Sequence, residues 1–241
     1  MFTNFGKREG FHSNPANSGS GIGVDWKQMG NIPPNKSIID VRHENLKSVK
    51  KIFEIHDIRY CLIFGTMLGQ YRGKNFIPGD EDDDVWIDNK DKGKFNDKLL
   101  RDFEKEGFYH TRSSLSAGLV SIGKNGRYID FCFNQQSDTK HPLLKNYYNI
   151  CFHWYDKTFF KGKFNMGILN NEEYPILHYP KQFLKNHYGN DFMTPSNTKS
   201  GGNDIVGIDG KSPSLKSIPK IVKRKKKKFA RNGMKRLLYG F

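Results

Sequence analysis

Cysteine, long apolar runs and a secretory leader are scarce or missing from this sequence. The chain of 241 residues has three cysteines, Cys61, Cys132 and Cys151, and none shows the C-x-x-C spacing of zinc or redox motifs. We interpret all three as reduced core thiols. No run of about 18 apolar residues is present, so no membrane-spanning helix is expected. The N-terminal segment has no apolar signal region. These absences predict a cytoplasmic protein, with peripheral contact to a membrane left open.

Acidic residues are missing from the C-terminal stretch 212–241, which carries eleven Lys or Arg. This stretch supplies most of the formal net charge of +15, so the isoelectric point of 9.6 describes the tail more than the rest. Its lysine run followed by Phe229, Leu237 and Tyr239 fits a solvated tail. It also fits binding to an anionic membrane surface or to nucleic acid. The sequence does not separate these three roles.

Hydrophobic residues are concentrated in the middle of the chain. Aromatic content is 14%, but hydrophobic content is only 36% and mean hydropathy is -0.73, which indicates a folded centre with unfolded ends. Residues 1–36 are rich in Gly, Ser, Asn and Pro and predict a flexible arm. Residues 197–241 predict a disordered basic tail. One catalytic domain is therefore expected over 37–196.

Hydrophobic periodicity over 37–196 predicts an α/β (α+β) domain. Helices are expected over 38–58 and 89–107, at a short segment opening near Gly65, and just before Gly189. Strands are expected at 60–64, 84–88, 118–123 and 127–133, with a strand pair near 150–160.

Five consecutive acidic residues occupy positions 80–84, where the chain enters a strand. Such runs are often solvated loops. Here the alternation of side chains along a strand would place Asp80, Asp82 and Asp84 on one face, with Glu81 and Asp83 turned away. Carboxylates held together raise one another's pKa, which is tolerable when a cation neutralises them. Ligands that are all oxygen select Mg²⁺ or Mn²⁺.

The segment before the acids supplies groups suited to phosphate. Gly65, Thr66 and Gly69 follow a strand and open a helix, whose N-terminus favours anions. Arg72 comes after that turn, where a fixed cation can hold a diphosphate. Lys74 is either a further phosphate contact or a surface lysine. This order of parts is typical of a site for metal-assisted phosphoryl transfer.

The string GTMLGQYRGKNFIPGDEDDDVWID resembles the signature of the LicD/fukutin-related family, roughly G-T-L-L-G-x-x-R followed by I-P-W-D-x-D-x-D. The matching positions are Gly65, Thr66, Leu68, Gly69, Arg72, Ile77, Pro78, Asp80, Asp82 and Asp84. A later Y-G-x-x-[WF]-x-x-P segment matches through Tyr188, Gly189, Phe192 and Pro195. The resemblance covers about residues 40–196. It departs at Gly79, where the family has tryptophan.

The resemblance implies a nucleotidyltransferase-like fold with a mixed sheet flanked by helices. It also implies transfer of a phosphorylated alcohol, such as phosphocholine or ribitol phosphate, from a CDP-linked donor to a glycan. Asp80, Asp82 and Asp84 would bind Mg²⁺ or Mn²⁺, with a further carboxylate from a neighbouring strand. The donor would contact the segment Gly65–Lys74, through Gly65, Thr66, Gly69, Arg72 and Lys74.

Asp130 is the best candidate for that further carboxylate, because it is the only acid in the strand 127–133. Its roles would be metal binding or deprotonation of the acceptor hydroxyl. The alternative is a solvent-facing strand residue, since alternation turns it away from Ile129 and Phe131. His153 and Trp154 are read either as lining a donor pocket or as packing residues.

Two other functions remain open. The same core could transfer a nucleotide to a small molecule, a protein or a nucleic-acid end. It could also be a catalytically silent binding module whose basic tail provides the function.

Overall fold

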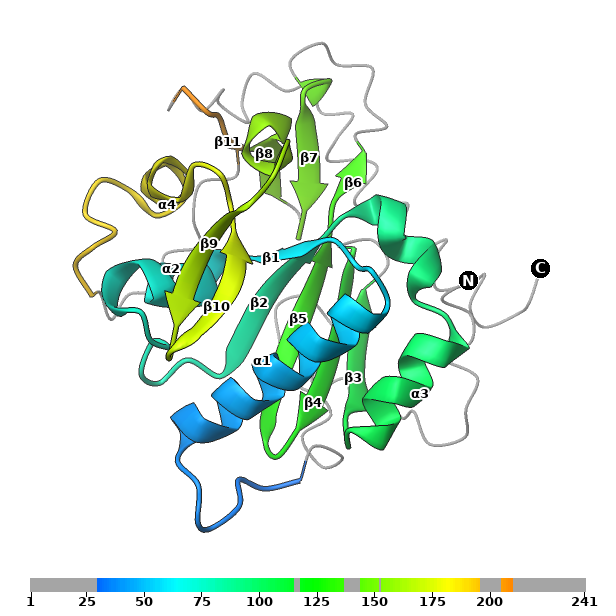
Figure 1. Ribbon diagram of the computed structural model, residues 1–241. Coiled ribbons are helices and arrows are strands. Elements are labelled where there is room, and N and C mark those ends of the chain that lie inside the picture. The colour runs from blue at the N-terminus through cyan, green and yellow to red at the C-terminus, as the bar shows by residue number, and fades with distance from the viewer. Residues whose placement is uncertain (1–29, 115–117, 137–143, 152, 196–204, 210–241) are drawn as a thin grey trace.

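The computed structural model describes residues 30–114, 118–136, 144–151, 153–195 and 205–209 (Figure 1). Most of the predicted N-terminal arm and nearly all of the predicted basic tail lie outside these residues. Within them, the expected α/β fold is confirmed: a mixed sheet is flanked by helices, and a smaller sheet lies beside it.

The larger sheet has seven strands in the order β3-β4-β5-β2-β1-β10-β9. β2 pairs with β5 and β1 with β10 in parallel, and the other neighbours are antiparallel. The strands are β1 (Tyr60–Leu62), β2 (Asp82–Ile87), β3 (Tyr109–Ser114), β4 (Leu119–Lys124), β5 (Arg127–Phe133), β9 (Asn165–Leu169) and β10 (Glu172–Ile176).

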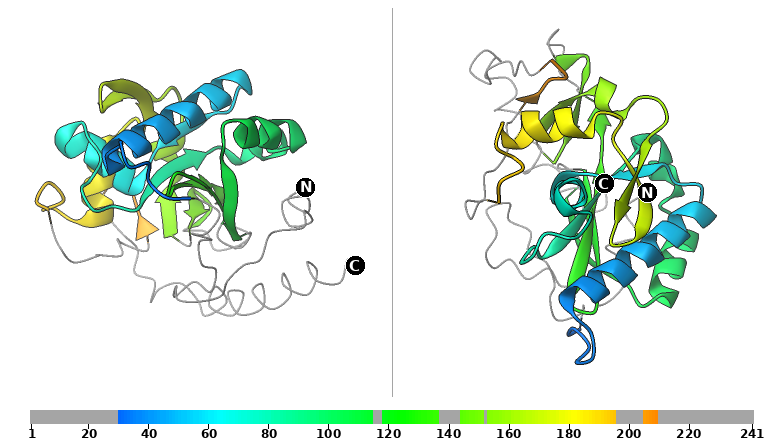
Figure 2. Two further views of the ribbon diagram at one scale, coloured as in Figure 1. Left: turned by 90° about the horizontal axis from the view of Figure 1, so that it is seen from below. Right: turned by 60° about the vertical axis from the view of Figure 1, so that its left-hand side comes forward.

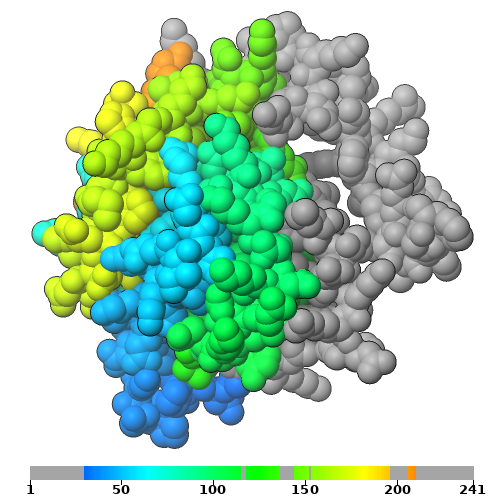
Figure 3. Space-filling model, turned by 45° about the vertical axis from the view of Figure 1, so that its right-hand side comes forward, coloured from blue at the N-terminus to red at the C-terminus, as the bar shows by residue number. Residues whose placement is uncertain are grey.

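Two helices cover one face of this sheet, α1 (Ile38–Ile55) and α3 (Asp97–Lys105). Figure 3 shows them side by side on the surface, α1 in blue and α3 in green. Phe53 of α1 and Phe103 of α3 both pack against Phe131 of β5, so these rings form the centre of the core between helices and sheet. Ser37 caps α1 in a capping box with Asp40, which fixes where that helix begins.

The other face of the sheet is bordered by the smaller sheet and by two further helices. The smaller sheet has the order β11-β8-β7-β6 and comprises β6 (Gln135–Gln136), β7 (Tyr147–Ile150), β8 (His153–Asp156) and β11 (Ile205–Val206). Helices α2 (Phe64–Gly73) and α4 (Pro180–Tyr188) lie against each other on this flank (Figure 2, right). The ring of Trp86 on β2 meets Phe160 here, so the second face is apolar at the end of β2.

One predicted helix is wrong in its extent. The segment 89–107 divides into a 3₁₀ helix, η2 (Asn89–Lys94), and the α-helix α3. Asn96 interrupts it because its side chain accepts from the backbone N–H groups of Lys98 and Leu99, which begins a new helix. Asp88 caps η2 by accepting from the N–H of Lys90.

Several boundaries are confirmed within one or two residues, and others are corrected. The β4–β5 hairpin turns at Asn125 and Gly126, both at positive φ. α4 ends at Gly189 as predicted. The end of the 150–160 segment is a short 3₁₀ helix, η4 (Lys157–Phe160). Strands β3, β9 and β10 were not predicted. Structure was not expected after residue 196, yet Ile205–Val206 pairs with β8.

In the part of the chain that the structure describes, no helix combines the length and apolar character needed to cross a bilayer.

Candidate metal centre

Three aspartates on the face of the sheet opposite α1 and α3 converge at one point. Asp82 and Asp84 lie on β2, and Asp130 lies on β5 in direct register with Asp84. One carboxylate oxygen of each lies within 4.8 Å of the others. Asp82 and Asp84 are half-buried and Asp130 is buried. The predicted alternation of the acids is therefore confirmed for Asp82 and Asp84, and the neighbouring strand adds the third carboxylate.

Asp80 borders this cluster without belonging to the group of three. A Cβ atom placed on Gly65 would lie 3.0 Å from Oδ2 of Asp80 and 3.4 Å from Oδ2 of Asp84, so these two oxygens flank the same point. The pKa of Asp80 is raised to about 6, first by burial and then by the charge of Asp82. Asp80 is thus a neighbour whose charge adds to that of the cluster.

The carboxylates that meet here are hard to ionise together. Burial raises the pKa of Asp84, and the charges of Asp82, Asp130 and Asp80 raise it further. Burial also raises the pKa of Asp130 to about 6, although Arg112 opposes the shift. Burial and the nearby carboxylates thus both disfavour ionisation at this site, and a bound cation would offset both effects.

Asp83, on the opposite face of β2, has a cation of its own. It is 1% exposed and pairs with Arg42 of α1, whose Nη2 lies 2.9 Å from Oδ1 of Asp83. The same guanidinium donates to the backbone carbonyls of Asp82 at 2.7 Å and Ile77 at 3.0 Å. Arg42 therefore fixes the backbone of the acidic segment as well as neutralising Asp83.

Gly65 and Thr66, at the start of α2, orient the acids from the other side. The backbone N–H of Gly65 donates to Oδ2 of Asp84 at 3.1 Å. The hydroxyl of Thr66 donates to Oδ1 of Asp83 and accepts from the backbone N–H of Asp84. Gly65 and Thr66, which the sequence predicted to contact the phosphorylated substrate, thus form hydrogen bonds with Asp83 and Asp84 in the structure.

Gly69, Arg72 and Lys74 do not join the three aspartates. A Cβ atom on Gly69 would lie 2.5 Å from the carbonyl oxygen of Asn75, so the glycine is required for close packing. Arg72 donates to the carbonyls of Phe192 and Thr194, which ties α2 to the segment after α4. Lys74 is exposed at the C-cap of α2. A donor contact by these residues stays a prediction.

Asp130 is not solvent-facing, because it is 5% exposed. Its Oδ2 accepts from Nη2 of Arg112 at 2.6 Å, and its Oδ1 accepts from the hydroxyl of Ser121. Nε of Arg112 also donates to the oxygen of Ser121 at 2.9 Å. Both oxygens of Asp130 are thus oriented by the protein, which favours a fixed ligand over a freely moving base.

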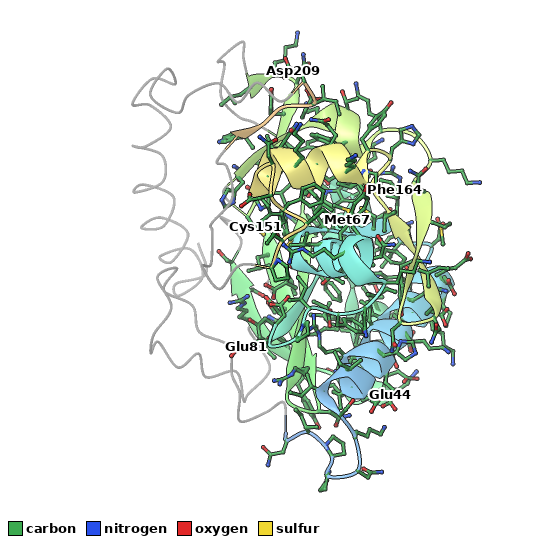
Figure 4. All side chains as sticks on the ribbon, turned by 90° about the vertical axis from the view of Figure 1, so that its left-hand side faces the viewer. Glu44, Met67, Glu81, Cys151, Phe164 and Asp209 are labelled. Atoms are coloured by element: carbon green, nitrogen blue, oxygen red, sulfur yellow. The ribbon has the colours of Figure 1, made fainter. Side chains whose placement is uncertain are left out.

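Two tyrosines lie close to the cluster. Burial raises the pKa of Tyr188, and the charges of Asp84 and Asp80 add to the shift. Tyr128 lies opposite Asp82 in the strand register, and burial and then Asp82 raise its pKa. In Figure 4, Glu81 and Cys151 mark this side of the molecule, at the left edge of the ribbon and away from α1.

His153 and Trp154 lie on β8 of the smaller sheet. Nδ1 of His153 is 3.0 Å from the carbonyl oxygen of Cys151, and Trp154 is buried against Leu144. Both arrangements fit the packing interpretation.

Arg42, Arg112 and Ser121 were missed by sequence reasoning. Arg42 could have been found from the sequence, because it lies on the apolar side of α1, where a charge without a partner would be costly. No sequence pattern indicates Arg112 or Ser121. Strand β3 shows no apolar alternation, and the register of the strands determines which residues lie opposite each other.

The donor set fits a hard divalent cation. Every ligand atom in the cluster is a carboxylate oxygen, the ligand type that Mg²⁺ and Mn²⁺ prefer. Asp82, Asp84 and Asp130 would hold the ion, with Asp80 next to it.

A family model described as the LicD/FKTN/FKRP nucleotidyltransferase domain matches residues 57–187. This range includes all three aspartates of the cluster and the whole of α2. No curated protein matches the chain.

Three solved structures are distant matches. The lincosamide antibiotic adenylyltransferase LnuA, bound to lincomycin, is 14% identical, with 64% of this chain and 86% of that one covered and a TM-score of 0.39. ANT(2'')-Ia in complex with adenylyl-2''-tobramycin is 11% identical, with 56% and 66% covered and a TM-score of 0.35. A solution structure of ANT(2'')-Ia is 12% identical, with 66% and 79% covered and a TM-score of 0.38. With TM-scores this low, nothing is inferred from these likenesses.

Proposed function

This chain belongs to the LicD/FKTN/FKRP nucleotidyltransferase-domain family, and on that premise we propose that it is a metal-dependent transferase. It moves a phosphorylated alcohol or sugar, of the phosphocholine or ribitol phosphate type, from a CDP-linked donor to a glycan hydroxyl. The observation that carries the proposal is the convergence of Asp82, Asp84 and Asp130 within 4.8 Å. Oxygen ligands in this arrangement suit the ions that organise phosphoryl transfer.

The three aspartates act as the holder of one or two Mg²⁺ or Mn²⁺ ions. When bound, the cation offsets the negative charge of the donor diphosphate and of the departing CMP. The protein fixes the ligands beforehand: Gly65 orients Asp84, and Ser121 with Arg112 orients Asp130. Preorganised ligands lower the cost of assembling the reactive complex.

The reaction proceeds by attack of the glycan hydroxyl oxygen on the phosphorus atom bearing the alcohol. The bond from that phosphorus to the bridging oxygen breaks, and CMP leaves with the electron pair. Asp130 has both oxygens engaged, so we assign it to metal binding and charge. The hydroxyl proton passes to Asp82, which is half-buried at the start of β2, whereas the other half-buried member, Asp84, accepts from the N–H of Gly65.

The start of α2 gives a second feature suited to a phosphorylated donor. Its N-terminal turn lies directly at the cluster, because the N–H of Gly65 contacts Asp84. The partial positive charge of a helix N-terminus favours anions nearby. A glycan or glycoconjugate acceptor, and a role of the tail 212–241 at anionic membranes or nucleic acid, are further parts of this proposal.

The test is metal-dependent release of CMP. CDP-ribitol, CDP-choline and CDP-glycerol are each incubated with Mn²⁺ or Mg²⁺ and a mixed glycan acceptor. We expect turnover of one donor, reduced by roughly 100-fold or more in Asp82→Asn, because a lost metal ligand removes several kcal/mol of transition-state stabilisation. Asp97→Asn, an exposed acid of α3, is the matched control.

Two results would contradict the proposal. If no donor releases CMP while base-labelled nucleotide appears on a product, the chain transfers nucleotide instead. If neither reaction occurs and Mn²⁺ raises the melting temperature of wild type and Asp82→Asn equally, the cluster is not a metal site.

A further inference from the structure

Arg112, Ser121, Asp130 and Asp84 form a row across four neighbouring strands. Arg112 of β3 is opposite Ser121 of β4, and Ser121 is opposite Asp130 of β5. Asp130 is in turn opposite Asp84 of β2. The row therefore places a guanidinium on the same sheet face as the carboxylate cluster, one side chain away from it.

A bulge in β3 is responsible for this placement. The register shifts between His110, which is opposite Ile122, and Arg112, which is opposite Ser121. In the unshifted register, position 111 would be opposite Ser121 and position 112 opposite Val120, on the apolar face under α1 and α3. Bulges commonly re-aim a side chain in this way.

The guanidinium of Arg112 is anchored by two of its three nitrogens. Nε donates to Ser121 and Nη2 donates to Asp130. Its Cζ lies 5.2 Å from the centre of the Tyr128 ring, and the side chain is 15% exposed. Within the described residues, Nη1 has no hydrogen-bond partner. The N–H groups of Nη1 are thus held in a fixed orientation at the edge of the cluster.

The charge balance at the cluster favours a role for Nη1 of Arg112 in binding an anion. Asp82, Asp84 and Asp130 carry three negative charges when ionised, which repel an anionic substrate. A divalent cation alone leaves one of them unbalanced, and Arg112 supplies the third positive charge. Arg42 cannot serve in its place, because it is 1% exposed on the opposite face of β2.

We propose that Arg112 is a phosphate-binding residue: Nη1 donates to a phosphate oxygen of the donor while Nε and Nη2 stay on Ser121 and Asp130. The proposal rests on the proposed function in one respect, that the substrate carries a phosphate or diphosphate. Arginine suits this task because its charge is permanent and its donors lie in one plane.

The test measures nucleotide binding at saturating Mn²⁺, so that metal occupancy is constant. CDP, ADP and cytidine are titrated by calorimetry into wild type, Arg112→Gln and Arg112→Lys, and Mn²⁺ binding is measured separately by electron paramagnetic resonance. Arg101→Gln, at an exposed arginine of α3, is the matched control. Melting temperatures confirm that each variant is folded.

We expect Arg112→Gln to weaken CDP binding by roughly 10- to 100-fold, the size of a lost charged hydrogen bond. Arg112→Lys is expected to be intermediate, and Arg101→Gln unchanged. Cytidine, which has no phosphate, should bind all variants alike. In turnover, the loss should appear in KM for the donor.

Three outcomes separate this inference from the proposed function. If Arg112→Gln binds CDP like wild type, Arg112 is only the structural partner of Asp130, and the inference fails while the transferase stands. If CDP binding depends on Arg112 but no CDP-linked donor turns over, the phosphate site stands and the transferase fails. If ADP binds with the same dependence and CDP does not, the site stands and the cytidine donor is wrong.

Discussion

The two faces of β2 treat the same run of acids in opposite ways. On the face toward α1, Asp83 is almost completely buried and has a permanent partner in Arg42, at 2.9 Å. On the other face, Asp82 and Asp84 meet Asp130, with Arg112 bonded to Asp130 alone. The fold neutralises Asp83, whereas within the described residues only Asp130 of the other three has a guanidinium partner.

The two faces separate an acid that stabilises the fold, Asp83, from acids available to bind a cation, Asp82, Asp84 and Asp130. A buried ion pair with several hydrogen bonds fixes the backbone, and it leaves no open position for a ligand. In the other group, burial and neighbouring carboxylates raise the pKa values of Asp84 and Asp130, and an external cation would relieve the crowding of negative charge. Neighbouring positions in one strand thus have separate roles.

The largest expected effect is on stability, from removal of the Arg42–Asp83 ion pair. Arg42→Met should lower the free energy of unfolding by about 3–5 kcal/mol, since it leaves Asp83 buried without its cation. Lys51→Met, at an exposed position of the same helix, should change stability little. Urea denaturation with the chelator EDTA present measures both. A loss below about 1 kcal/mol for Arg42→Met would show that the ion pair does not hold the acidic segment.

The second effect is a dependence of stability on pH that arises from Asp130. The pKa of Asp130 is about 6 in the folded chain against an ordinary 3.8, so its contribution to stability is complete below about pH 4 and is lost as pH rises through about 6. In EDTA, the stability of wild type relative to Asp130→Asn should fall by up to about 3 kcal/mol over that range.

Asp102 of α3 provides the control with the opposite sign. Hydrogen bonds from Lys105 and His56 lower its pKa, so its contribution is present at neutral pH and is lost as pH falls below its ordinary value. The stability of wild type relative to Asp102→Asn should therefore rise with pH, whereas the stability relative to Asp130→Asn falls with pH. Equal slopes for the two pairs would contradict the charge imbalance at the cluster.

Two glycines of α2 give the third effect. Gly69→Ala should cost about 1–3 kcal/mol, because its Cβ would lie 2.5 Å from the backbone carbonyl of Asn75. Gly65→Ala should instead weaken Mn²⁺ binding, since its Cβ would press on the oxygens of Asp80 and Asp84. Thermal unfolding and a Mn²⁺ titration of both variants separate packing from ligand geometry. Loss of Mn²⁺ affinity in Gly69→Ala alone would reverse the assignment.

The smallest effect concerns Thr66, whose hydroxyl bonds the side chain of Asp83 and the backbone of Asp84. Thr66→Val should lower stability by about 1–2 kcal/mol, because the N–H of Asp84 and a carboxylate oxygen of Asp83 lose a partner. Thr66→Ser keeps the hydroxyl and should stay close to wild type. Identical unfolding curves for the valine and serine variants would show that these hydrogen bonds contribute nothing.

Local patterns predicted the elements that contain the site. The strand 60–64, the turn to α2 and the acidic strand follow from apolar runs, glycines and alternation, which depend only on neighbours in the chain. The helix over 89–107 was wrong because the cap at Asn96 competes with helical periodicity. Strand β3 was missed because its sequence YHTRSS has no apolar alternation.

Local sequence patterns were enough to predict that acids alternate along one strand, and that a short helix opening near Gly65 precedes them. Which of those acids has an ion-pair partner among the described residues depends on long-range packing. Arg42 reaches Asp83 from a helix about 40 positions away, and a bulge turns Arg112 to the face of Asp130. Such pairings depend on the register of strands and on helix packing, which place residues far apart in sequence within a few ångströms.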